Sequence, residues 1–139
     1  MQQSKLIQLL KTLTKKEFKE FQGYVSSEFF NKNQQLVRLL EYLSIYQGSF
    51  ETPKLDKETF FKKHYPGEKF EEQKFRYLQS DLTKLLEDFI AYTQYNKDSF
   101  QKSYFLLEAL NQRNQDKYFL QELDAIKETN DESPYRDSL

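Results

Sequence analysis

The stretch FRYLQSDLTKLLEDFIAY, residues 75–92, decides the fold of this chain. Its apolar side chains recur every three or four residues, at Phe75, Leu78, Leu82, Leu85, Phe89 and Tyr92, with Leu86 and Ile90 beside them. This heptad-like spacing places them on one stripe of an α-helix, and the charged residues between them lie nearer the opposite face. Because neither Gly nor Pro interrupts the run, the pattern predicts one long central helix over about residues 71–95.

The composition predicts an all-α protein. Phe and Tyr make up 17% of the 139 residues, so aromatic rings and Leu must supply much of the core. Only two Val and four Ile are present, which disfavours β-strands. We expect a bundle of six or seven helices around the long one, in a single domain over residues 1–130, followed by a loose tail at 131–139.

Capping residues mark where other helices begin and end. Ser4 precedes the first apolar run, and Thr14 with Glu17 has the spacing of a capping box. Asp98 is a further candidate N-cap. A polar segment around Asn114 predicts a corner that divides residues 98–129 into two helices, with one continuous helix as the alternative.

Several loop residues carry local expectations. Gly48 and Asp56 are expected to end the third helix and to begin the fourth. Gly23 lies inside a helix, where a close helix crossing would explain it. Phe29 and Phe30 precede two asparagines that favour a turn, and we expect both rings to fold back and fill the core beneath it.

The last two predicted helices are similar in pattern to the opening pair of a helical-repeat array. Such arrays stack several units and end in a polar cap, and no cap is evident in this sequence. Two interpretations stay open: the chain is the N-terminal part of a longer helical protein, or it is a small bundle with a frayed tail.

Residues that carry chemistry are scarce. The chain has no Cys and one His, His64, so we expect neither a thiolate nucleophile nor a tetrahedral zinc site. Its three Gly are isolated, so no phosphate-binding loop can be drawn. We therefore expect no enzymatic activity, no catalytic residue, no cofactor or metal and no small-molecule substrate.

The segment 56–86 resembles the helix-turn-helix core of winged-helix regulators. The resemblance lies in FFKKHYPG at 60–67 followed by FRYLQSDLTKLL at 75–86, which match the second and third helices of that fold. In that family the third helix enters the major groove of DNA by its N-terminal residues. The resemblance therefore implies a nucleic-acid surface made by Lys69, Gln73, Lys74 and Arg76, although Glu68, Glu71 and Glu72 would face the phosphates and no two-stranded wing follows.

The wider run from Leu6 to Leu82 is similar to the N-terminal region of an uncharacterised family of bacterial all-helical proteins. This resemblance implies a helical fold and no activity. The net charge of −1 gives no overall attraction to nucleic acid or anionic lipid, and no apolar run is long enough to span a membrane. We expect a cytoplasmic interaction or scaffold module that binds a protein partner or a second copy of itself, with nucleic-acid binding as the alternative.

Overall fold

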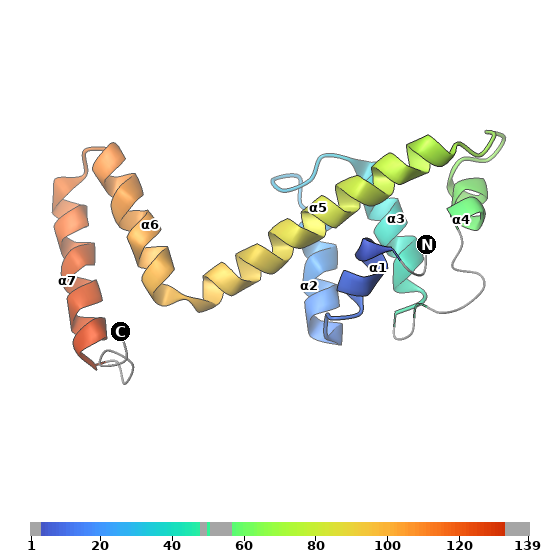
Figure 1. The fold of residues 1–139 in the computed structure, drawn as a ribbon. Helices are drawn as coiled ribbons and strands as arrows, with labels where there is room; N and C mark the ends of the chain where they lie inside the picture. The colour runs from blue at the N-terminus through green and yellow to red at the C-terminus, as the bar shows by residue number, and fades with distance from the viewer. Residues whose placement is uncertain (1–3, 48–49, 51–56, 133–139) are drawn as a thin grey trace. The chain divides into compact units, whose positions relative to one another are not determined.

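The computed structural model describes residues 4–47, 50 and 57–132, and of the last three residues only the backbone. These residues form seven α-helices and no strand (Figure 1), which confirms the all-α prediction. The helices are α1 (Lys5–Leu10), α2 (Lys15–Ser26), α3 (Gln34–Ser44), α4 (Lys57–His64), α5 (Glu72–Lys97), α6 (Ser99–Gln112) and α7 (Asp116–Glu132). The long central helix expected over 71–95 is α5.

Contacts within the chain divide it into two compact units, Met1–Ile90 and Ala91–Leu139. The division falls inside α5, whose first part belongs to the first unit. In the second unit, α6 and α7 pack on each other. The length of the chain predicts a single domain over residues 1–130. That the two units fold together as one domain stays a prediction.

Local capping signals begin the helices of the first unit as predicted. Ser4 caps α1 by accepting a hydrogen bond from the backbone of Ile7. At α2 the capping box is complete: the Thr14 hydroxyl accepts from the Glu17 backbone at 3.1 Å, and the Glu17 carboxylate accepts from the Thr14 backbone at 2.9 Å. These bonds satisfy donors that the first turn of a helix leaves free.

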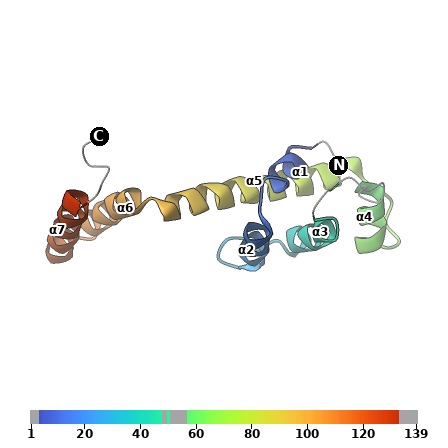
Figure 2. The ribbon, with the colours of Figure 1, turned by 90° about the horizontal axis from the view of Figure 1, so that it is seen from below.

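The core of the first unit is built along one stripe of α5. Phe21 of α2 packs against Phe89 with ring centroids 5.2 Å apart, and Phe60 of α4 packs against Phe75 at 5.9 Å. Different helices therefore pack against the two ends of the stripe, and α3 contacts both α2 and α4. Figure 2 shows α2, α3 and α4 following one another along this part of α5.

The buried stripe of α5 departs from the heptad by one position. Leu86 is fully buried, whereas Leu85 is only partly buried. A regular α-helix turns about 100° per residue, so its buried side drifts from a strict seven-residue repeat by about 20° per heptad. After Leu82 this drift turns Leu86, and not Leu85, towards the core. A strict heptad stays buried only if the helix supercoils, and α5, which packs against several short helices, does not need to supercoil.

The turn between α2 and α3 is held by Asn31. Its buried amide donates to the carbonyls of Val25 and Asn33 at 2.9 and 3.1 Å, and Asn33 caps α3. The expectation that both rings before it fill the core was wrong for Phe29, which is 88% exposed. Phe30 stacks on Tyr24 at 4.2 Å but is also exposed, and Asn31 is the buried side chain of this turn.

Other local expectations have mixed outcomes. A close helix crossing does not explain Gly23, since a Cβ atom built there would meet open space. The turn after α4 contains Gly67 with φ of +84°, a backbone conformation that glycine adopts without strain. α3 ends at Ser44, before Gly48, and both Gly48 and Asp56 lie outside the described residues.

The second unit is an αα-hairpin, and the predicted corner at Asn114 is confirmed. Asn114 has φ of +58°, and the Gln115 backbone N–H donates to the Leu110 carbonyl at 2.9 Å, which closes the end of α6. Asp98 caps α6 through the backbone of Gln101 at 3.0 Å, as expected. α7 continues through Glu132, and the rest of the predicted tail lies outside the described residues.

None of the helices that the structure describes is both long enough and apolar enough to cross a bilayer.

The register of α5 can be tested with two neighbouring leucines. Leu86→Ala should lower the free energy of unfolding by about 2–5 kcal/mol, because it leaves a cavity in a filled core. Leu85→Ala, the matched control, should cost less, because part of that side chain is already in water. Urea unfolding followed by circular dichroism measures both, and a larger loss for Leu85→Ala would contradict the assigned register.

Candidate functional site

The second unit carries large apolar side chains that the structure leaves in solvent. On α6, Phe100, Tyr104 and Phe105 are 57%, 55% and 49% exposed, and no side chain of this helix is buried. On α7, Tyr118 and Leu120 are also more than half exposed. The apolar spacing of a helix alone does not show whether such side chains stay uncovered.

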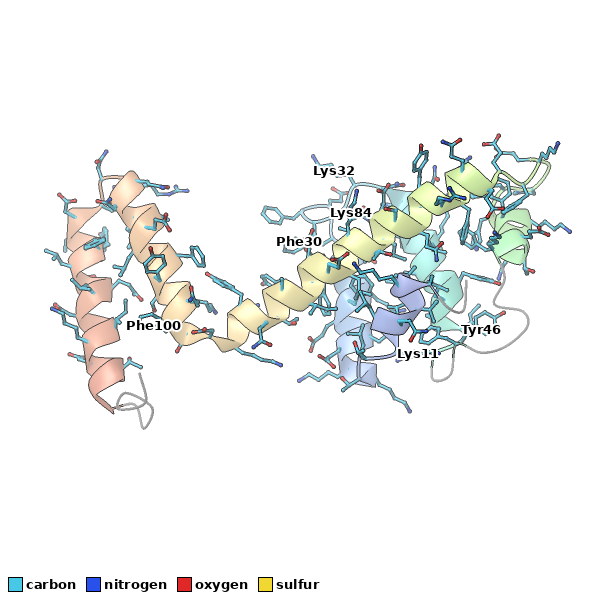
Figure 3. All side chains as sticks on the ribbon, in the orientation of Figure 1. Lys11, Phe30, Lys32, Tyr46, Lys84 and Phe100 are labelled. Atoms are coloured by element: carbon cyan, nitrogen blue, oxygen red, sulfur yellow. The ribbon has the colours of Figure 1, made fainter. Side chains whose placement is uncertain are left out.

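The exposed rings of α6 do not form one stripe. Residues four apart lie on the same side of a helix, so Phe100 and Tyr104 share one side. Phe105 and Ala109 share another, turned by about 100° because Phe105 directly follows Tyr104. Figure 3 labels Phe100 in the first turn of α6. The apolar side chains of α6 therefore lie on two different sides of this helix.

One side of the hairpin has an open hollow of about 430 Å³, which we call the Leu106 hollow. Its lining comes from the end of α5 and from both hairpin helices: Tyr95, Ser99, Lys102, Ser103, Leu106 and Glu122. The Tyr95 ring also packs against Phe105, with centroids 5.7 Å apart. Lys102 and Glu122 form no ion pair with any described residue.

A second, smaller hollow of about 240 Å³ lies between α6 and α7. Ser103 and Ile126 face it from the two helices, with Phe100, Ala125 and Thr129 nearby. Its wall combines hydroxyl groups and apolar carbon with the Glu122 carboxylate, which also lines the Leu106 hollow. This hollow can receive an apolar side chain.

The four residues of the helix-turn-helix resemblance lie in the first unit, between the end of α4 and the first turns of α5. Gln73 and Lys74 line one hollow with Tyr77 and Asp81. Arg76 lines a different one, with Lys84 and residues of α1. Lys69 is exposed in the connection between α4 and α5.

Two of these four side chains are already engaged. The Lys74 ammonium lies 4.3 Å from the centroid of the Tyr65 ring and 3.4 Å from the Glu68 carboxylate. The Gln73 amide donates to the Tyr77 hydroxyl at 2.9 Å. Seven residues separate α4 from α5, where a helix-turn-helix motif has a turn of about three or four. Nucleic-acid binding stays an untested prediction.

His64, the single histidine, ends α4 among aromatic rings. Its ring lies 4.6 Å from Phe60 and 6.4 Å from Tyr42, measured between centroids. Its buried Nε2 atom has no hydrogen-bond partner among the described residues. The pKa of His64 is lowered from its ordinary 6.5, first by burial and then by the positive charges of Lys63 and Arg38, which favours the neutral imidazole.

Among the other described titratable groups, the pKa shift of Glu72 has a local cause. Lys57 donates a hydrogen bond to the Glu72 carboxylate at the start of α5, and this bond lowers the pKa of Glu72. Within the part of the chain that the structure describes, no group of three His, Asp or Glu side chains could hold a metal ion. The apolar surface of the hairpin is therefore the feature that calls for a functional explanation.

The lowered pKa of His64 predicts how stability depends on pH. Because the folded state binds the proton less readily than the unfolded state, the contribution of neutral His64 is complete above the unfolded pKa of about 6.5. It is lost as the pH falls from there towards the lower folded pKa. Urea titrations between about pH 7.5 and 5.5 should show a smaller pH dependence for His64→Asn than for the wild type, and equal slopes would contradict this account.

Comparison with protein-family models, with curated proteins and with solved structures yields no match. No relative supplies an activity, a partner or a site residue for this chain. Its function must therefore be inferred from the geometry of the described residues, above all from the exposed rings of α6 and α7.

Proposed function

We propose that this chain is a non-catalytic helical interaction module and that the α6–α7 hairpin is its binding surface. The observation that carries the proposal is the exposure of Phe100, Tyr104 and Phe105 on a helix without a buried side chain. Monomeric proteins rarely expose contiguous apolar patches of more than a few hundred Å², and larger ones mark interaction sites. We infer from the exposed rings that a partner covers the hairpin.

The chemistry of the hairpin favours a protein partner. Aromatic rings are enriched at the centres of protein interfaces, and Tyr joins a large apolar ring to a hydroxyl that tolerates water. Between residues 99 and 129 the chain has four basic and five acidic side chains, so the hairpin lacks the positive field that attracts phosphates. An amphipathic helix, laid with its apolar stripe along α6 or α7, is the partner that fits this surface.

We also propose where the module acts in the cell and that it is not a catalyst. A chain without Cys suits the reducing cytoplasm, where we propose that the module acts. His64 is half-buried in the first unit and packs against Phe60, and we propose that its role is packing. We propose that the first unit is a rigid support and that it binds no substrate.

Site-specific photo-crosslinking tests this proposal. A photoreactive phenylalanine analogue replaces Tyr104 or Phe105 in the full chain, and the matched control replaces Tyr77, which is 60% exposed on α5 of the first unit. After irradiation in cells that express the chain, we expect protein adducts from the two hairpin positions and none from the control. Mass spectrometry of the adducts identifies the crosslinked peptide, which should come from an amphipathic helix.

Two outcomes would contradict the proposal. One is the absence of any adduct from either hairpin position in a chain whose circular dichroism is unchanged. The other is a nucleic acid attached to the chain in place of a protein, which would support the helix-turn-helix alternative.

A further inference from the structure

We propose that the partner of the hairpin is a second copy of this chain, which docks on the Leu106 hollow. This inference rests on the proposed function, since it names the occupant of the same surface. It follows from the way in which opposite charges and apolar side chains are combined around the hollow.

The apolar part of the hollow is suited to a buried contact. Leu106 is 44% exposed at its wall, and Tyr95 lines the same hollow from the end of α5. On α7, Tyr118 lies one turn before Glu122 and therefore on the same side of that helix. A partner that covers this face would bury aromatic rings and a leucine that are in solvent now.

The charged part of the hollow is self-complementary. α6 places the Lys102 ammonium one turn before Leu106, and α7 places the Glu122 carboxylate one turn after Tyr118. Each helix thus presents one charged and one apolar side chain a turn apart, and the two charges have opposite signs. Neither Lys102 nor Glu122 has an ion-pair partner among the described residues.

This arrangement is compatible with a two-fold symmetric interface. In such an interface residue i of one copy meets residue j of the other, and j meets i, so a face of a single sign would repel itself. A face with one cation and one anion can instead form two equivalent pairs, each between Lys102 of one copy and Glu122 of the other. The net charge of −1 adds little repulsion between whole copies.

Sedimentation velocity of the purified full chain over a range of concentrations tests this inference. The wild type should associate reversibly to a dimer. Lys102→Glu and Glu122→Lys should each weaken the association by about tenfold or more, because each places like charges opposite each other. Glu108→Lys is the matched control: Glu108 lies on the side of α6 opposite Ser99, away from the hollow, and its reversal should leave the association unchanged.

Mixing the two charge-reversed chains gives the sharpest result. Lys102→Glu has two acidic residues at the hollow and Glu122→Lys has two basic ones, so an equimolar mixture should form a heterodimer with the affinity of the wild type. Recovery on mixing also shows that both variants are folded.

Three results would overturn the inference: a wild type that stays monomeric at all concentrations, single variants that associate as well as the wild type, or a mixture that stays monomeric. If the wild type is monomeric while the hairpin positions crosslink to a different protein, the proposed function stands and only the second copy is excluded. If the hairpin positions crosslink to nothing, the proposed function fails.

Discussion

Burial of one face of α5 is the constraint on which the first unit depends. Phe75, Leu82 and Phe89 span almost four turns of that face, and short helices cover it in succession. None of α1 to α4 exceeds twelve residues, and helices of that length are marginal in water without tertiary packing. The long helix therefore supplies the apolar surface that makes the shorter helices stable, and they in turn exclude water from it.

The features of this chain that can be predicted from its sequence are those whose deciding interaction is local. The capping box at Thr14 and the corner at Asn114 depend on residues within a few positions of each other, so their chemistry can be recognised without the fold. The choice of Leu86 over Leu85 depends on which helices cover α5, which a seven-residue pattern does not contain. The turn before α3 presents the same difficulty. The apolar ring of Phe29 suggests burial, but the buried side chain is that of Asn31, whose amide donates to the Val25 carbonyl.

The candidate site illustrates the limit of periodicity more directly. The apolar spacing of α5 and that of α6 look alike in the sequence, and both predict an amphipathic helix. Yet Phe89 is buried by α2, whereas Phe105 is half exposed. Periodicity tells which side of a helix is apolar, and only the presence of a covering helix decides whether that side becomes core or surface. In the same way, a list of basic residues could not show that Lys74 lies over the Tyr65 ring.

Contacts within the hairpin fix the positions of the helices that carry its exposed apolar side chains. Asp98 satisfies a free donor at the start of α6, and the positive φ of Asn114 turns the chain into α7. Both the cap and the turn are formed by residues of the hairpin and its first flanking residue, so its geometry does not depend on another molecule. A surface that is ordered before binding loses less conformational entropy on binding, and its apolar contacts then contribute more of their free energy to affinity. The exposed rings of α6 and α7 therefore lie on a hairpin whose own backbone contacts hold its helices in position.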